Sequence, residues 1–182
     1  MQRAIPVTAY EEMPAPYRGT PIERLVAWHN GFSGEPEAAV TRAEVLVGMC
    51  MDNRKKLRIP ENFAFILRAG GGNLRPSEFK VSFAVAVGGV HAIAIIVHNH
   101  CGMVGLSGRR EQFVNGLVEA GWERDAAEQH FDSYAPLFEI GNEIDFVLAE
   151  AKRLRMRYPK VLVAPLFYNV DDNRLYCLNE DL

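Results

Sequence analysis

The run AIAIIV at residues 92–97 decides the fold, because it is continuously apolar and short enough to be a buried strand. Two further runs, EVLVGMC at residues 44–50 and FAFIL at residues 63–67, have the same character. Strands that are apolar along their whole length, rather than at alternate positions, are typical of a parallel sheet covered on both faces. These three runs therefore predict the centre of such a sheet.

The segment between the second and third runs, Pro76–Val87, fits two structures. Its apolar residues alternate from Val81 to Val87 as in a strand, whereas Phe79, Phe83 and Val87 recur as on a helix. Parallel strands need a crossover between them, and this crossover is usually helical. We therefore predict a helix here.

The remaining elements complete an α/β fold. Thr20 and Pro21 are typical of a helix start, and Gly31 of its end. The predicted class is a mainly parallel central sheet with an antiparallel C-terminal edge strand and helices on both faces. Residues 1–19, with three prolines, predict an extended N-terminal arm, and residues 20–182 a single α/β domain. Further helices are predicted at residues 109–120, 125–134 and 144–158, and a closing hairpin of strands at residues 161–167 and 175–178.

Composition narrows the class of protein. The 182 residues carry a formal charge of −3, which gives no electrostatic reason to expect nucleic acid or an anionic membrane as a partner. No apolar run approaches the length of a membrane span, so we expect a cytoplasmic protein. An odd number of cysteines in such a protein, here Cys50, Cys101 and Cys177, favours metal binding or catalysis over disulfides.

Two of these cysteines fall at strand ends. Cys50 ends the first predicted strand, His98 ends the third, and Cys101 follows three residues later. If the two strands are neighbours, all three side chains meet at the carboxyl edge of the sheet, where α/β proteins bind ligands. Two thiolates and one imidazole suit a single zinc ion, and three protein ligands leave the open position of a catalytic site. The alternative is two buried structural thiols.

A carboxylate and a guanidinium lie just beyond the first ligand. Asp52 could accept a hydrogen bond from a water molecule at the metal and orient it, while Arg54 clamps Asp52 bidentately. If Arg54 releases it, Asp52 could bind zinc directly and expel the water. The simplest alternative is an ordinary surface ion pair. We predict Asp52 and Arg54 as catalytic residues.

These residues match a family pattern. Cys50-x-Asp52-x-Arg54, followed by His98-x-x-Cys101-Gly102, resembles the β-class carbonic anhydrases. The glycine-rich turn at residues 68–73 and the hairpin at residues 163–178 are similar to segments of that family. The resemblance implies a mainly parallel sheet, a tight homodimer, zinc on the Cys-His-Cys set and Asp52 with Arg54 as a dyad. Three residues depart from the usual pattern, namely Asn53 for serine, Val97 for glycine and His100 for aspartate.

The resemblance implies a zinc lyase that hydrates carbon dioxide reversibly to bicarbonate. A second hypothesis keeps the site but hydrolyses carbonyl sulfide or carbon disulfide. A third is a zinc-binding regulatory protein without catalysis, in which Asp52 is a permanent fourth ligand. His100 is either a proton shuttle, since an unperturbed imidazole titrates near neutral pH, or a rim residue without a role.

Overall fold

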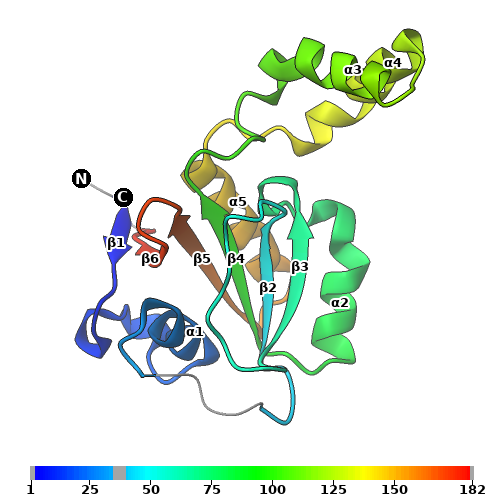
Figure 1. Ribbon diagram of the computed structural model, residues 1–182. Helices are drawn as coiled ribbons and strands as arrows, with labels where there is room; N and C mark the ends of the chain where they lie inside the picture. The colour runs from blue at the N-terminus through cyan, green and yellow to red at the C-terminus, as the bar shows by residue number, and fades with distance from the viewer. Residues whose placement is uncertain (1–2, 35–39, 181–182) are drawn as a thin grey trace.

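A computed structural model describes residues 3–34 and 40–180, which form a six-stranded sheet in the order β1-β6-β5-β4-β2-β3 (Figure 1). Strands β5, β4, β2 and β3 run parallel to one another. Strand β6 is antiparallel to β5, and β1 is antiparallel to β6. This arrangement confirms the predicted fold class. The strands are β1 (Ala4–Pro6), β2 (Val45–Cys50), β3 (Ala64–Ala69), β4 (Ala92–His98), β5 (Leu162–Asn169) and β6 (Arg174–Leu178).

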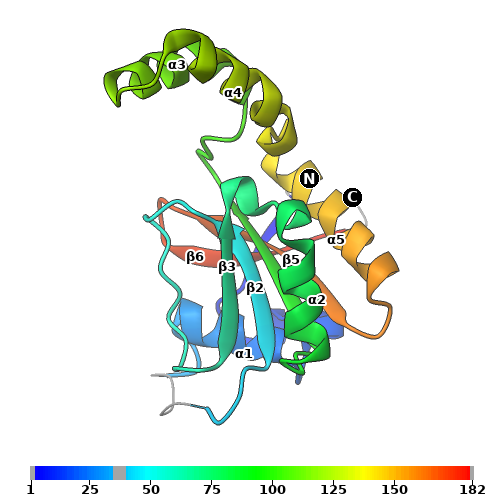
Figure 2. The ribbon, with the colours of Figure 1, turned by 90° about the vertical axis from the view of Figure 1, so that its right-hand side faces the viewer.

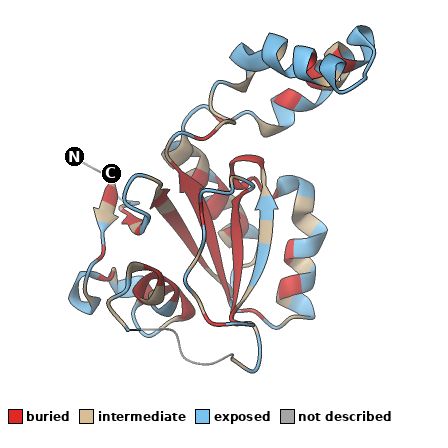
Figure 3. Cartoon of the chain, in the orientation of Figure 1, coloured by how far each residue is buried: buried red, intermediate tan, exposed pale blue. Residues whose placement is uncertain are grey.

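Helices cover both faces of the sheet, and the alternation of side chains along each central strand explains its continuous apolar sequence. In β4, Ala94 and Ile96 pack towards α1 (Pro21–Asn30), whereas Ile93 and Ile95 pack towards α2 (Glu78–Ala86) and α5 (Glu143–Arg157). Figures 1 and 2 show α1 on one face and α2 with α5 on the other, and Figure 3 shows the central strands buried between them. The predicted crossover helix is confirmed as α2.

Two helices stand apart from this sandwich. Helices α3 (Arg110–Glu119) and α4 (Arg124–Phe138) form a hairpin that projects beyond the carboxyl ends of the strands (Figures 1 and 2). Helix α4 begins at Arg124, one residue before the predicted start at residue 125, and the preceding Glu123 makes no side-chain capping hydrogen bond. It also runs four residues beyond the predicted end at residue 134, since Pro136 is accommodated in its last turn.

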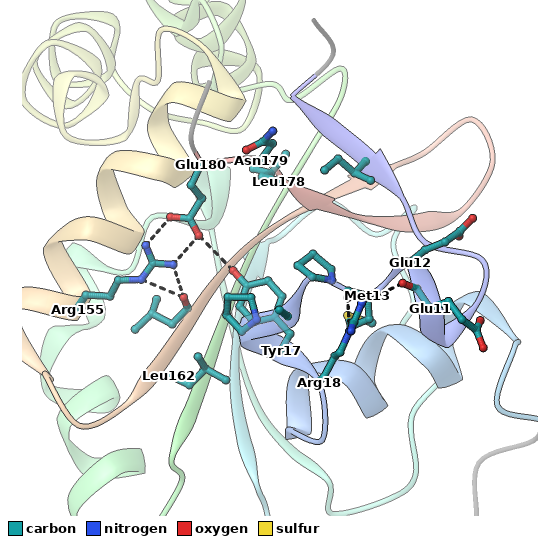
Figure 4. Close-up of a pocket in the computed structure, with 15 residues that line it drawn as sticks. Glu11, Glu12, Met13, Tyr17, Arg18, Arg155, Leu162, Leu178, Asn179 and Glu180 are labelled. Atoms are coloured by element: carbon teal, nitrogen blue, oxygen red, sulfur yellow. Dashed lines mark hydrogen bonds and ion pairs between the residues drawn. The ribbon is translucent and has the colours of Figure 1, made fainter.

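The N-terminal segment, predicted as an extended arm, joins the sheet. Ala4 pairs with Leu178, so β1 lies outside β6, which is therefore not the edge strand. Two short 3-10 helices follow, at Tyr10–Glu12 and Ala15–Tyr17. Figure 4 shows the pocket between this segment and the C-terminal end of the chain, where the Tyr17 hydroxyl donates to Glu180 at 3.2 Å and Arg155 also binds Glu180.

The opposite edge of the sheet is apolar and exposed. The expectation that all three apolar runs are covered on both faces is wrong for β3, which is an edge strand in the single chain. Large apolar side chains of β3, of the neighbouring α2 and of the residue that follows α2 reach the surface, namely Phe65, Ile66, Phe79, Phe83 and Val87. We call these five residues the β3–α2 face. Among the described residues, no helix combines the length and apolarity that crossing a membrane requires.

Candidate metal centre

The ends of two neighbouring strands bring together the three predicted metal ligands. Cys50 is the last residue of β2 and His98 the last of β4, and these strands run parallel with Met49 beside Ile96. Cys101 returns to the same edge after a tight turn, in which His100 has a positive φ of 57°. One donor atom from each of the three residues lies within 4.8 Å of the other two, so Cys50, His98 and Cys101 could hold a metal ion.

The imidazole of His98 is oriented for this purpose. Its Nδ1 lies 2.8 Å from the carbonyl oxygen of Asn99. Because a carbonyl oxygen can only accept, Nδ1 is the donor, and in the neutral imidazole this tautomer leaves the lone pair on Nε2. This Nε2 is buried and has no hydrogen-bond partner among the described residues. Buried polar atoms are rarely left unpaired, and a metal ion would satisfy this one.

The two thiols are buried and strongly coupled, with their sulfur atoms 4.0 Å apart. The hydrogen bond from Cys101 is the largest factor that lowers the pKa of the Cys50 thiol, and the backbone N–H groups of Asp52 and Gly71 act in the same direction. The same contact raises the pKa of the Cys101 thiol. One thiolate is therefore favoured even without a metal, and a thiolate is the form that binds one. Two such sulfurs with one imidazole match the donor preference of zinc.

Asp52 lies beside this donor set and is clamped by Arg54. The guanidinium Nε and Nη2 of Arg54 donate to Asp52 Oδ1 and Oδ2 at 3.0 and 2.6 Å, and the Arg54 backbone N–H donates to Oδ1 at 2.9 Å. These bonds, from the side chain above all, hold the pKa of the Asp52 carboxyl well below its ordinary value. Asp52 Oδ2 is 3.9 Å from His98 Nε2. An ionised carboxylate is thus fixed next to the candidate metal position.

The glycine-rich turn at residues 70–72 lies against the same edge. Gly72 has a φ of +75°, and a Cβ atom there would come within 3.3 Å of the carbonyl oxygen of Ile96 and 3.8 Å of the Cys50 nitrogen. Both the backbone conformation and the close approach therefore require glycine at this position. The backbone of the turn packs directly against the strand ends that carry the cysteine and histidine.

Sequence reasoning missed two basic residues of this site. Arg68 donates to the carbonyl oxygens of Cys50, Asp52 and Lys55 at 3.2, 3.3 and 3.0 Å, so it ties together the loop that follows β2. Lys55 is fully buried, with 0 % of its surface exposed. A lysine beside an arginine in a polar loop normally indicates solvent exposure, and only the folded loop reveals its burial.

Two pockets flank the site, and Met51 lines both. One is polar, and its lining includes Asp52, Arg54, His100 and Arg109. His100 is 66 % exposed there, and its Nε2 lies 3.7 Å from Asp171 Oδ2. The other pocket is almost wholly apolar, has a volume of about 280 Å³ and lies under the α3–α4 hairpin. Its lining residues include Met51, Gly70, Met103, Phe131 and Phe138.

Comparison with known proteins identifies the fold. No protein-family model matches the sequence, and no curated protein matches it. A carbonic anhydrase from Glaciozyma antarctica superimposes with a TM-score of 0.62 at 21% identity, over 77% of this chain and 85% of that protein. The β-carbonic anhydrase isoform I from Trichomonas vaginalis gives a TM-score of 0.63 at 16% identity, over 78% and 87% of the two chains.

A carbon disulfide hydrolase in its apo form is also similar. It gives a TM-score of 0.57 at 20% identity, over 78% of this chain and 81% of its own. At these identities the likeness concerns the fold alone. The chain has the β-carbonic anhydrase fold, with a Cys-His-Cys cluster that could bind a metal at the carboxyl edge of its sheet.

Proposed function

We propose that this protein is a divergent β-class carbonic anhydrase that binds one zinc ion through Cys50, His98 and Cys101. The observation that carries the proposal is the buried, unpartnered Nε2 of His98 beside two coupled thiols. Three donors of this kind leave zinc the open position that distinguishes catalytic from structural sites. The reaction is the reversible hydration of carbon dioxide to bicarbonate.

When bound, zinc would acidify a water molecule and so supply a nucleophile at neutral pH. The protein contributes orientation. Asp52 remains ionised because Arg54 holds its pKa low, and an ionised carboxylate can only accept a hydrogen bond. It therefore orients the attacking water with a lone pair towards the substrate. Arg54 keeps Asp52 in place and, through a 3.2 Å bond from Nη2 to the carbonyl oxygen of His100, links the dyad to the turn before Cys101.

The apolar pocket supports a small, uncharged substrate. It begins at Met51, next to the first ligand, and almost all of its lining is apolar. Such a lining suits carbon dioxide, which has no net charge or dipole. It equally suits carbonyl sulfide or carbon disulfide, and the structural similarity to a carbon disulfide hydrolase favours this second candidate reaction on the same site. Sulfide release from these substrates, with poor hydration of carbon dioxide, would identify the second reaction.

We further propose a homodimer as the basic assembly. The exposed β3–α2 face supports self-association, because large apolar side chains exposed along a sheet edge and on the helix beside it are unfavourable in water. Neither nucleic acid nor a membrane is required as a partner by this proposal. The cytoplasmic location stays a prediction.

A stopped-flow assay of carbon dioxide hydration on the zinc-loaded protein tests the proposal. We expect hydration that is lost, together with zinc, in Cys101→Ala. A protein that binds zinc stoichiometrically but does not accelerate hydration or release sulfide would contradict an enzymatic role. Zinc spectroscopy that showed Asp52 as a fourth ligand at every pH would then favour the regulatory protein.

A further inference from the structure

Asn99 lies between the candidate ligands His98 and Cys101, and the proposed reaction leaves it without a role. Its backbone carbonyl oxygen accepts the 2.8 Å hydrogen bond from the His98 ring. Its side chain binds a different part of the fold, the turn at residues 170–173 between β5 and β6. There Asn99 Oδ1 accepts from the backbone N–H of Val170, and Nδ2 donates to Asp171 Oδ2, each at 2.8 Å. One residue therefore connects a candidate metal ligand to the β5–β6 turn.

The amide group of Asn99 matches both of its partners in this turn. The backbone N–H of Val170 can only donate, and the ionised carboxylate of Asp171 can only accept. A side-chain amide offers one acceptor and one donor on the same planar group. An apolar side chain at this position would bind neither partner, and the contact with the turn would be lost.

The Asn99 side chain also continues the sheet where the backbone leaves it. Strands β4 and β5 pair in parallel up to His98 and Tyr168, and the chain then turns at His100, which has a φ of 57°. A backbone N–H just beyond the end of a ladder needs another acceptor. Asn99 Oδ1 provides it for Val170, so the backbone carbonyl group of Asn99 is free to face the His98 ring.

The turn that holds Asn99 has hydrogen bonds of its own. Asp172 Oδ1 accepts from the backbone N–H of Arg174 at 3.0 Å, and Asp172 Oδ2 accepts from the Tyr176 hydroxyl at 2.5 Å. These bonds do not involve Asn99. The turn therefore has a fixed shape against which the Asn99 amide can be held, and Asp172 offers a control that weakens the turn without touching this amide.

We propose that Asn99 is a positioning residue of the metal centre, and that Asp171 holds its side chain in place. Through its carbonyl oxygen, Asn99 orients the His98 ring so that Nε2 stays with the sulfur atoms of Cys50 and Cys101. Groups that orient a metal-binding histidine in this way typically affect metal affinity by about 10-fold to 100-fold. The inference rests on the proposed metal site, but its readout is metal binding and not the hydration of carbon dioxide.

Cobalt(II) titration of the metal-free protein, followed by visible absorption, tests the proposal. In Asn99→Ala we expect the cobalt affinity to fall about 10-fold to 100-fold and the cobalt absorption bands to change, because the His98 ring is no longer fixed. The matched control is Asp172→Ala, which removes two hydrogen bonds from the same turn and none from Asn99. We expect this control to unfold at a lower temperature but to keep the wild-type cobalt affinity and spectrum.

An exchange of the amide and the carboxylate tests the contact with Asp171. The double variant Asn99→Asp with Asp171→Asn keeps the net charge and keeps one donor and one acceptor across the contact. A carboxylate at position 99 can still accept from the backbone N–H of Val170. We therefore expect the double variant to bind cobalt with an affinity close to that of the wild type. Binding as weak as that of Asn99→Ala would overturn the role of Asp171.

The remaining outcomes decide the role of Asn99. Equal cobalt affinity and spectra in the wild type and in Asn99→Ala would overturn this role and leave the proposed metal site intact. Equal losses in Asn99→Ala and Asp172→Ala would also overturn it, because any weakening of the turn would then have the same effect. Asn99→Ser serves as a second variant, and failure of both variants to fold would make Asn99 a structural requirement instead. A wild-type protein that binds no cobalt would refute the proposed site, and this inference with it.

Discussion

The dyad can be tested by a double-mutant cycle on Asp52 and Arg54. In Asp52→Asn, one of the two carboxylate oxygens becomes an amide group, which can no longer accept from Arg54 and carries no charge. Oriented hydrogen-bond groups of this kind are typically worth about 10²–10³ in rate, or about 3–4 kcal/mol. Arg54→Gln should cost less, about tenfold to 100-fold, because Asp52 keeps its charge and only its position is loosened.

The double variant gives the decisive value. If Arg54 acts only through Asp52, Asp52→Asn with Arg54→Gln should be no slower than Asp52→Asn alone, within about threefold. The assay is stopped-flow hydration at saturating zinc, with Lys56→Met as an unaffected control. Multiplied losses in the double variant would refute the reasoning, since they would mean that the two residues act independently.

Stability measurements test whether lost activity in these variants comes from unfolding. Although its bonds are short, the pair is partly exposed, with 18 % of the Asp52 side chain and 48 % of the Arg54 side chain accessible. Exposed pairs contribute about 0–1 kcal/mol to folding. The variants should therefore unfold within a few degrees of the wild type, and lost activity can be assigned to the site.

Three further predictions address stability and assembly. Burial lowers the pKa of His29 to about 4, so below pH 6.5 the unfolded state binds more protons than the folded state. The free energy of unfolding should therefore fall by about 3 kcal/mol as the pH decreases to 4. Urea unfolding of His29→Gln should lack this decrease. Phe83→Asp, on the exposed β3–α2 face, should give a folded monomer in analytical ultracentrifugation, whereas a persistent dimer would place the interface elsewhere. Removal of metal by a chelator should lower the unfolding temperature by roughly 8–16 °C if zinc was present at about 1,000 times its Kd, as measured by calorimetry, with Cys101→Ala insensitive to the chelator.

The parallel core could be predicted because its pattern has a simple physical origin. Every residue of β4 from Ala92 to His98 is buried, alternately on the two faces of the sheet, and this produces the unbroken apolar run. The second run looks the same in sequence, but β3 is an edge strand with Phe65 and Ile66 exposed. An apolar surface inside one chain and an apolar surface suited to contact between chains are built from the same apolar residues. Sequence alone therefore does not distinguish the two.

The N-terminal strand illustrates a different limit. β1 is only three residues long and ends in Pro6, so it has neither periodicity nor strong strand propensity. It forms because the free edge of β6 supplies hydrogen-bond partners, with Ala4 opposite Leu178. The strand is thus determined by a contact that spans almost the whole chain.

The residues of the site also differ in how far the sequence predicts their positions. Its three metal-ligating candidates were found because strand ends meet at one edge, a rule that needs only the order of elements. Arg68 and Lys55 escape such a rule, since their positions depend on how the loop after β2 closes. Arg68 reaches three carbonyl groups that are distributed over six residues, and no spacing in the sequence indicates this.

The departures from the family pattern lie outside the apolar pocket, which bears on the substrate. Val97 is buried on the face that carries α2 and α5, and its neighbour His98 points to the other face. Asn53 and His100 are exposed at the polar side of the dyad. None of the three lines the apolar pocket beneath the α3–α4 hairpin. Selection between carbon dioxide and its sulfur analogues should therefore depend on Met103, Phe131 and Phe138 of that pocket rather than on these substitutions, and enlarging it with Phe138→Ala should favour the bulkier carbon disulfide.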